Sequence, residues 1–411
     1  MDNTLPFMTD HLPGFSADLR VRNEDFVVQE MPQYLPAGEG THVYFLMEKS
    51  GLTTLQAIGR IASALNIKQR DIGYAGQKDS HGVTRQWISI EHIDPQALIQ
   101  RELAHITIRD HGFHGNKLRV GHLKGNRFLI KLRGLDCPLS QALDRATKIL
   151  DLLCAKGAPN YYGPQRFGNQ YNSHWLGKAI LSNDVEQFFD VFLGQPDKAV
   201  GSNTLEGRMF FSQGDYQKAF EAWPPAFYDE RRMLRELLYQ NGHKKRVYRH
   251  VNKTMKRFYI SAFQSYVFNL VLEARMPDID ILLTGDVAYK HDNGACFLVE
   301  DASLEQTRCQ AFDISATGPI FGSHMKSTQQ EAAQIEDPII LAQASDILNH
   351  PAVLKKDNIK GARRPLRMHP ENASVTSGSD DLGDFLELAF DLPSGSYATV
   401  LAREFLKRDI S

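Results

Sequence analysis

One acidic residue of this sequence stands in a setting that could support chemistry. Asp79 follows Lys78 inside the segment 73–86, which reads GYAGQKDSHGVTRQ and leads into a run of strand-forming residues. Glycines let a backbone turn tightly and let a substrate approach closely. A carboxylate presented there, and kept ionised by a nearby cation, could act as a nucleophile or a base at a sugar carbon. The same residue types also describe a surface turn in which Asp79 caps its own backbone, and composition alone favours that turn.

Several common catalytic and cofactor motifs are missing from the sequence. It contains no G-x-x-x-x-G-K-[ST], no G-x-G-x-x-G and no H-E-x-x-H, so no nucleotide cofactor is predicted. His111 and His114 form a His-x-x-His pair without an obvious third ligand, which favours ordinary loop histidines over a metal site. Ser396 lies in Ser-Gly-Ser-Tyr, which is not a nucleophile elbow. We therefore expect neither a metal nor a cofactor.

The elements that position Asp79 belong to a mixed α/β region formed by the first 150 residues. Residues 17–31 alternate between apolar and charged, which predicts a strand interrupted by a turn at Asn23-Glu24. The other expected elements are strands at 42–48 and 84–90, a helix that begins at Thr53 or Thr54, and an amphipathic helix over 138–154. This pattern is typical of an antiparallel sheet packed against helices.

The middle of the chain has a different character. Residues 158–280 are mostly helical in pattern and rich in aromatic side chains, and strand signals return at 297–299 and 385–391. A helix is expected again from about Thr399. A chain that is sheet-rich at both ends and helical in the middle suggests one domain inserted within another. The polar segment 372–380 is expected to be a loop, and its role is open.

Composition restricts the class of protein further. Apolar residues make up 42% of the chain and charged residues 23%, which is typical of a soluble globular protein. No window approaches eighteen uninterrupted apolar residues, so no membrane span is expected. Residues 1–12 lack the basic and apolar regions of a secretory signal. The four cysteines are widely spaced without a C-x-x-C pair, which fits reduced thiols and a cytoplasmic location.

Positive charge is concentrated locally on a chain whose formal net charge is only −2. Residues 111–133 contain six Lys or Arg and no acid, and residues 237–258 contain seven and no acid. A third cluster at 355–367 contains six with one acid, Asp357. Such patches can bind phosphates independently of base sequence. The alternative is a solvated face whose counter-charges come from elsewhere in the fold.

Ordered motifs along the chain resemble those of the TruD family of transfer RNA pseudouridine synthases. The segment around Asp79 resembles the family's Gly-x-Lys-Asp-x-x-x-x-Thr-x-Gln signature. Further matching blocks follow the family's order: 20–30 (RVRNEDFVVQE), 125–128 (GNRF), 159–168 (PNYYGPQRFG), 317–319 (TGP), 363–366 (RRPL) and 392–399 (LPSGSYAT). His81-Gly82 and Tyr162 depart from the usual residues without touching the proposed chemistry. The resemblance spans residues 18 to 408.

The resemblance implies both a fold and a reaction. The fold is α+β, with a pseudouridine-synthase-like catalytic domain that has a mostly antiparallel sheet and carries a large inserted α/β TRUD domain. The implied boundaries are 1–157 for the first part of the catalytic domain, 158–360 for the inserted domain and 361–411 for the last part. The implied reaction converts uridine to pseudouridine in transfer RNA, at uridine-13, without metal or nucleotide. We expect a monomer.

Carried over residue by residue, the resemblance also assigns a site. Asp79 is the essential carboxylate, which either attacks C1′ or abstracts a ribose proton; the sequence leaves both routes open. Arg20 is expected to pair with Asp79, and Asn126 to orient its carboxylate by a hydrogen bond. The substrate-binding residues implied are Lys78, Phe128, Gln165 and Arg166.

Some of these assignments have structural alternatives. Phe128 alternates with Ile130 and Leu132, so it also fits an ordinary core phenylalanine. Gln165 and Arg166 also fit structural support of the domain junction. Two other functions remain to be compared: a non-catalytic RNA-binding or RNA-chaperoning protein that keeps the fold but does not need Asp79, and a glycosidase or nuclease. For a glycosidase or nuclease, the sequence shows no identifiable partnered carboxylate or metal cluster.

Overall fold

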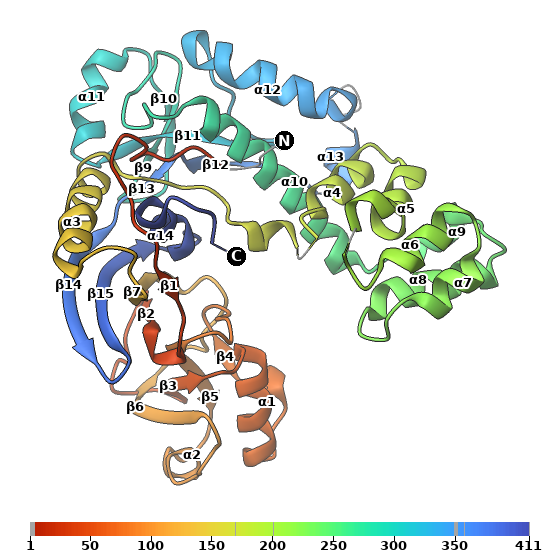
Figure 1. Cartoon of the computed structure of the whole chain (residues 1–411). Coiled ribbons are helices and arrows are strands. Elements are labelled where there is room, and N and C mark those ends of the chain that lie inside the picture. Colours follow the sequence, from red (N-terminus) through yellow and green to blue (C-terminus); the bar gives the residue numbers. More distant parts are fainter. Residues whose placement is uncertain (1–4, 169, 200, 349–351, 357, 411) are drawn as a thin grey trace. The chain divides into compact units, whose positions relative to one another are not determined.

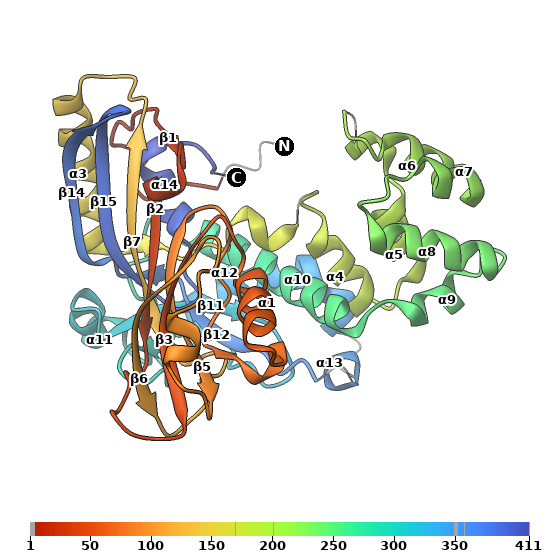
Figure 2. The same ribbon diagram turned by 90° about the horizontal axis from the view of Figure 1, so that it is seen from below.

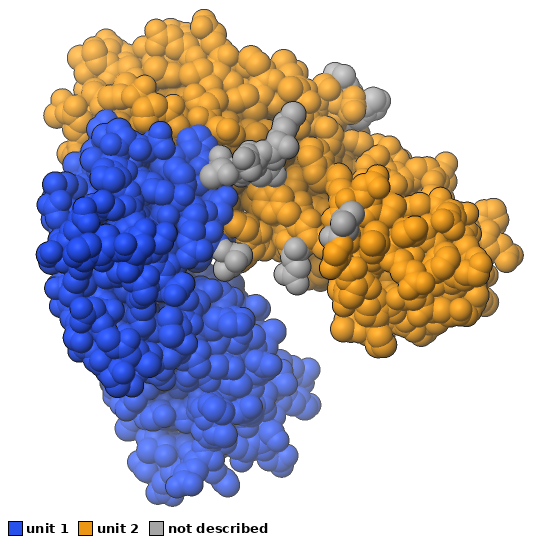
Figure 3. Space-filling view, viewed as in Figure 1, with its two compact units in different colours: residues 1–160, 367–410 blue, residues 161–366, 411 orange. Residues whose placement is uncertain are grey.

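The computed structural model describes residues 5–168, 170–199, 201–348, 352–356 and 358–410, and it divides into two compact units (Figures 1 and 3). Unit 1 comprises Met1–Asn160 and Arg367–Ile410, and unit 2 comprises Tyr161–Leu366. The chain therefore leaves unit 1 after Asn160 and returns to it at Arg367; the sequence placed these boundaries at 157/158 and 360/361. Asp357, the acid of the third basic cluster, lies outside the described residues.

Unit 1 is built on a nine-stranded sheet with the order β14-β15-β7-β2-β5-β3-β6, in which β1 also pairs with β7 and β4 with β5. All described pairs are antiparallel except β2 with β5. The strands are β1 Asp18–Leu19, β2 Phe26–Pro32, β3 His42–Ser50, β4 Gly73–Tyr74, β5 Val83–Glu91, β6 Ile106–His114, β7 Leu123–Arg133, β14 Glu371–Asp380 and β15 Gly383–Pro393. A further short pair joins β8 Ala158–Pro159 to β13 Arg367–Met368.

The helices of unit 1 cover this sheet because each has an apolar face. The α1 helix packs through Ala57, Ile58 and Ile61 onto apolar side chains of β3 and β5. The α3 helix runs along β14 and β15 (Figure 2). The helical elements are η1 Asn23–Asp25, α1 Thr54–Leu65, η2 Gln69–Asp71, α2 Gln96–Ile99, α3 Leu139–Lys156 and α14 Ala398–Leu406. The mostly antiparallel sheet with helices confirms the α+β prediction.

The polar segment expected to be a loop at 372–380 is instead the edge strand β14, so that prediction was wrong. Its alternating exposure pattern is that of a strand with one solvated face. Its last residue, Asp380, accepts hydrogen bonds from both terminal nitrogens of Arg133, at 2.8 and 2.7 Å. Arg133 is 3% exposed and also forms a bidentate pair with Asp25 of η1, at 2.9 and 2.8 Å. These charge-assisted bonds fix the hairpin of β14 and β15 to the end of β7.

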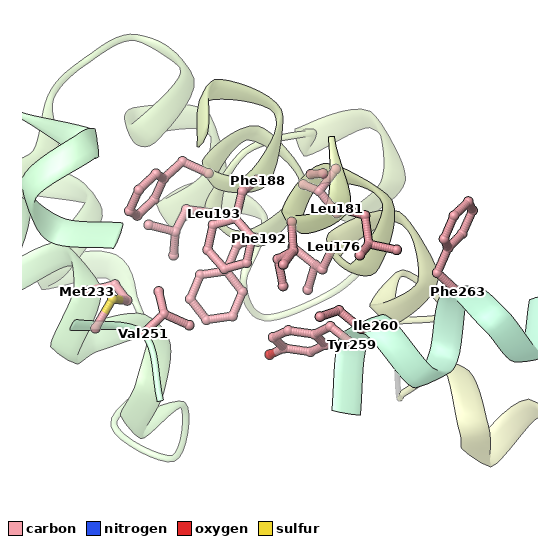
Figure 4. Close-up of a cluster of buried hydrophobic side chains, with 14 of the residues drawn as sticks. Leu176, Leu181, Phe188, Phe192, Leu193, Met233, Val251, Tyr259, Ile260 and Phe263 are labelled. Carbon is pink, nitrogen blue, oxygen red and sulfur yellow. The ribbon is translucent and has the colours of Figure 1, made fainter. Parts of the chain in front are cut away.

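Unit 2 begins with a helical region. Figure 4 shows the apolar cluster inside it, where Phe188, Phe192 and Leu193 meet Tyr259 and Ile260 of the long helix α10. The elements are η3 Pro164–Phe167, α4 Ser173–Leu181, α5 Val185–Leu193, η4 Pro196–Ala199, α6 Leu205–Ser212, α7 Tyr216–Ala222, α8 Tyr228–Tyr239, α9 Lys244–Val247, η5 Tyr248–His250 and α10 Lys253–Ala274. Burial of these large aromatic and aliphatic side chains is the main stabilisation of the region.

The rest of unit 2 contains a four-stranded antiparallel sheet with the order β10-β9-β11-β12. Its elements are β9 Val287–Lys290, β10 Cys296–Leu298, α11 Ala302–Gln310, β11 Ile314–Ile320, α12 Gln330–Leu348, α13 Ala352–Lys356 and β12 Ala362–Pro365. Arg363 of β12 is buried and forms a bidentate pair with Glu336 of α12, with both contacts at 2.7 Å. Among the described helices of both units, none combines the length and apolar composition that a bilayer-spanning helix needs.

The glycine of the Gly-Asn-x-Phe block has a steric reason that can be tested. A Cβ on Gly125 of β7 would lie 2.2 Å from the carbonyl oxygen of Leu392 on the paired strand β15. We expect Gly125→Ala to lower the free energy of unfolding by about 1–3 kcal/mol, the usual range for overpacking. Gly115→Ala is the matched control, because nothing lies within 4 Å of its Cβ position. Urea denaturation of both variants checks this, and equal losses would contradict it.

Candidate active site

A row of polar side chains crosses one face of the unit 1 sheet, on the side that α1 covers. Asn126 of β7 is paired with Glu30 of β2, and the parallel register of β2 with β5 places Gln86 next to Glu30. Glu30 and Gln86 are 3% and 0% exposed. Buried polar groups need partners, because an unpaired one retains its desolvation penalty. The partners come from the loop 75–82, from the start of α1 and, for Glu30 Oε1, from the amide of Trp87 in β5 at 3.3 Å.

Lys78 enters this row from the loop. Its Nζ donates a hydrogen bond to Asn126 Oδ1 at 2.5 Å and lies 3.7 Å from Glu30 Oε2. Burial raises the pKa of Glu30 to about 7, and the charge of Lys78 opposes that rise. Burial also lowers the pKa of Lys78, and Glu30 opposes that shift. Each group therefore stabilises the charged form of the other in a site that disfavours both charges.

The backbone of the same loop is held at three residues. Gln86 Nε2 donates to the carbonyl oxygen of Gly76 at 3.1 Å. The amide of Lys78 donates to Thr54 Oγ1 at 2.8 Å, and that hydroxyl donates in turn to Gln86 Oε1 at 2.7 Å. Lys49 Nζ donates to the carbonyl oxygen of Asp79 at 2.9 Å. The loop is thus fixed from β5, from the first residue of α1 and from the end of β3.

Asp79 is oriented away from this buried row. Its side chain is exposed, while the preceding Lys78 is 9% exposed. In the described part of the chain, no group donates a hydrogen bond to the Asp79 carboxylate. Three cations nevertheless act on its charge electrostatically: Arg20, Lys49 and Lys78. The arrangement presents a carboxylate whose lone pairs are free for an incoming substrate.

Arg20 lies beside this carboxylate. Its guanidinium is over the ring of Phe26, 4.3 Å from the centroid, which is a cation–π contact. Burial lowers the pKa of Arg20, and the charge of Asp79 opposes that shift. Within the described residues the two side chains form no direct ion pair, so their attraction acts over a longer distance than the expected pairing. Arg20 Nε is buried and has no acceptor among the described residues.

Asn126 and Phe128 lie on the same sheet face as Glu30. Asn126 contacts Lys78 rather than the carboxylate of Asp79, so any effect on Asp79 acts through Lys78. Phe128 is 7% exposed, and its ring packs against Phe26 and Phe390, with centroids 6.3 and 5.5 Å away. These contacts are those of a core aromatic residue, and a stacking role for Phe128 stays a prediction.

Gln165 and Arg166 belong to unit 2, and the structure describes their surroundings there. Gln165 is exposed and Arg166 is half-buried in η3. Arg166 donates from Nε to Ser265 Oγ at 3.2 Å and also bonds to Ser261 Oγ, both on α10. Its guanidinium therefore anchors η3 to α10 within unit 2. The structure brings together Asp79, Lys78, Asn126, Arg20 and Phe128, all in unit 1.

Four residues of this site were not identified from the sequence: Glu30, Lys49, Thr54 and Gln86. Glu30 is the last residue of the N-terminal block 20–30, and Gln86 is the last residue of the signature around Asp79. Their positions marked them as parts of these motifs but did not indicate their role. Lys49 gave a weaker signal, a lysine that follows an apolar strand. Only the strand register shows that these residues converge on one loop.

The other candidates from the sequence are not part of this site. His111 and His114 lie in strand β6, so the expectation of loop histidines was wrong. The ring of His114 stacks on Tyr44 at 4.9 Å, and its Nδ1 accepts from the amide of Asn116. Across the residues that the structure describes, His, Cys, Asp and Glu side chains form no group of three or more suited to holding a metal ion.

Comparison with known proteins identifies the family. The family model for tRNA pseudouridine synthase D (TruD) matches residues 3–405. A protein from Geotalea daltonii named tRNA pseudouridine synthase D is 42% identical over 404 residues, which cover 98% of this chain and 99% of that protein. A protein of the same name from Thermus thermophilus is 35% identical over 408 residues, with 98% and 92% covered. The chain belongs to the TruD family.

The fold has a counterpart of known structure. A crystal structure from Methanosarcina mazei that carries the same family designation superposes with a TM-score of 0.82 at 24% sequence identity. The match covers 98% of this chain and 96% of that one. At this identity the comparison bears on the fold, and it confirms the predicted α+β arrangement.

The buried lysine of β3 gives a pH-dependent prediction. Burial lowers the pKa of Lys49 from 10.5 to about 8, so between these values the unfolded chain binds the proton that the folded chain has released. Stability therefore rises with pH through this window. Relative to Lys49→Met, the wild type should gain free energy of unfolding as the pH rises from 8 toward 10.5. Urea denaturation of both proteins at several pH values measures the difference, and a constant difference would contradict the assignment.

Proposed function

We propose that the protein isomerises uridine to pseudouridine in transfer RNA, with Asp79 as the essential carboxylate and without a cofactor. The observation that carries this proposal is the exposed carboxylate of Asp79, which three cations influence and which a loop fixed at Gly76, Lys78 and Asp79 presents. Membership of the TruD family along nearly the whole chain supports the same reaction.

The chemistry requires one bond to break and another to form. The glycosidic bond between N1 and C1′ breaks, and the base rejoins C1′ through C5. C5 then loses a proton and N1 gains one, so that atoms and electrons balance within the nucleotide. An ionised carboxylate serves either route: attack on C1′ gives an ester of the sugar, and removal of a ribose proton gives a glycal. Asp79 has free lone pairs for either step.

The sugar of an RNA strand must become accessible to this carboxylate. The target uridine therefore has to leave its stack, at a cost of a few kcal/mol. The charge of Arg20 interacts with that of Asp79, and we assign its guanidinium to charge stabilisation at the reacting centre. We assign Phe128 to the apolar floor beneath the base, because it lies on the same sheet face as Asn126 and Glu30.

The remaining assignments concern the substrate. We propose uridine-13 of transfer RNA as the target, because the family resemblance implies that position. Lys78 and Asn126 act by fixing the loop, since their side chains are bonded to each other. Gln165 is exposed and available for an RNA contact, whereas the bonds of Arg166 to α10 favour structural support.

The essential role of Asp79 is the first prediction to test. Purified wild type and Asp79→Ala are incubated with unmodified transfer RNA transcripts, without added metal or nucleotide. Carbodiimide labelling followed by primer extension then locates pseudouridine as a stop. We expect one stop, at uridine-13, with the wild type and none with Asp79→Ala. The variant should keep its fold, because the replaced side chain is exposed and accepts no hydrogen bond from the described residues.

Asp71→Ala is the matched control, since Asp71 is another exposed aspartate, located in η2 before the loop. It should retain the stop. A stop that persists in Asp79→Ala would remove Asp79 from the chemistry. Tight binding of transfer RNA by the wild type without any stop would favour the non-catalytic RNA-binding protein instead. A stop at another uridine would correct the target and leave the reaction unchanged.

Arg20 should affect turnover more than binding. Loss of a preorganised charge beside the reacting centre typically lowers kcat by about a hundredfold or more. We therefore expect Arg20→Ala to lower the single-turnover rate by about that factor while the Kd for transfer RNA changes much less. Arg20→Lys should restore part of the rate, and the exposed Arg70→Ala should change neither quantity. An unchanged rate for Arg20→Ala would exclude Arg20 from the site.

A further inference from the structure

A cavity of about 990 Å³ in unit 2 contains a second concentration of positive charge. The beginning of α10 lines the cavity with Lys253, Lys256 and Arg257, and the segment 358–362 lines it with Lys360. These residues come from the second and third basic clusters of the sequence, which are about a hundred residues apart. The fold therefore combines two separate basic clusters around one cavity.

The positive charge of this cavity is not neutralised within the described chain. Lys253, Arg257 and Lys360 are exposed, and none of the three forms an ion pair with a described carboxylate. No described residue lining the cavity is acidic. Lys256 differs, because its Nζ donates to the carbonyl oxygen of Tyr248 at 3.2 Å and lies 3.7 Å from the centroid of the Tyr248 ring. It contributes a positionally fixed charge.

Three other cations of unit 2 show how a carboxylate partner neutralises such a charge. Lys244 contacts Glu186 at 2.6 Å, Arg308 contacts Glu305 at 2.7 Å, and Arg363 contacts Glu336 at 2.7 Å. Exposed cations that share one cavity repel one another, so their proximity is destabilising unless an anion binds there. The geometry favours an anionic ligand with several charges.

The wall that carries Lys360 is held in place by backbone contacts. The amides of Ser323 and His324 donate to the carbonyl oxygens of Ile359 and Lys360, at 2.9 and 2.8 Å. Gly361 has a φ of +77°, and a Cβ there would lie 2.7 Å from the amide nitrogen of Gly322. Only glycines allow this close approach of the two segments. Lys360 is therefore presented by a preorganised segment.

We propose that this cavity binds phosphodiester groups of the RNA substrate through Lys253, Arg257 and Lys360. The proposal rests on the proposed function, which supplies a polyanionic substrate. A free nucleotide offers the same phosphate chemistry, but its phosphates are typically held by backbone amides of a glycine-rich loop, and the chain has no G-x-x-x-x-G-K-[ST] motif. Separate lysine and arginine side chains from two segments of the chain suit successive phosphates of one strand. None of these residues belongs to the Asp79 site.

The salt dependence of binding tests this proposal. Each cation that neutralises a phosphate contributes about one to the slope of log Kobs against log salt. The Kd of a transfer RNA transcript is measured at several salt concentrations for the wild type and for Lys253→Ala/Arg257→Ala. We expect the magnitude of the slope to fall by about two in the double variant. Lys360→Ala, in the segment 358–362, should lower it by about one.

The matched control is Lys245→Ala/Arg246→Ala. These two residues belong to the same basic cluster, are exposed, and do not line the cavity. The control should leave the slope unchanged, and thermal unfolding of every variant should match the wild type. Equal changes in the two double variants would show diffuse attraction rather than a site and would overturn the proposal. An unchanged slope in the cavity variants would also overturn it.

Two further measurements separate the possible causes of failure. With transfer RNA as substrate, the cavity variant should raise KM and leave kcat unchanged, because it loses binding that is equal in ground and transition states. If the cavity variants show the expected changes in slope but the wild type forms no pseudouridine, the proposed function alone is contradicted. A different result is that the cavity variant loses saturable binding of uridine monophosphate while its salt slope for transfer RNA equals that of the wild type. That result would identify a free nucleotide as the ligand and overturn the inference.

Discussion

The candidate active site depends on the burial of one ammonium group, that of Lys78, between Glu30 and Asn126. A buried charge is costly unless it is paired and hydrogen-bonded, and here both conditions are met at 3.7 and 2.5 Å. With Lys78 fixed inward against the sheet, the adjacent Asp79 is directed outward. The outward position of the Asp79 carboxylate is therefore a consequence of how Lys78 is buried.

The sheet makes this burial possible by providing a matching row of partners. The register places Asn126, Glu30 and Gln86 on adjacent strands. Lys78 bonds to Asn126 and pairs with Glu30, and Thr54 bonds to Gln86. The amide of Trp87 donates to Glu30 Oε1. Thr54 is also the first residue of α1, whose capping box uses Thr53 and Gln56. Lys49 bonds to the carbonyl oxygens of both Leu52 and Asp79. The turn before α1 and the loop of Asp79 are consequently tied to the same strand end.

The sequence predicted the α+β class and most elements, because hydrophobic periodicity is a local property. It also located Asp79, but only through the ordered motifs, since an aspartate in a glycine-rich turn is common. It did not identify Glu30, Lys49, Thr54 and Gln86 as supports, because their convergence depends on strand register. It also did not identify the hydrogen bond between Asn126 and Lys78. Residues 372–380 were misassigned because a polar edge strand lacks the apolar alternation from which strands are recognised.

The balance of charge around Asp79 suits the RNA substrate that we propose for it. Two unit charges about 7 Å apart repel by about 2–3 kcal/mol at an effective dielectric constant of 20, so a lone carboxylate would oppose the phosphates that flank a target sugar. Arg20, Lys49 and Lys78 offset that repulsion. Lys49 and Lys78 are buried, at 1% and 9% exposure, and are bonded to other acceptors. Their fields reach Asp79 through the protein without occupying its lone pairs, and so a carboxylate can be surrounded by positive charge and still be free to react.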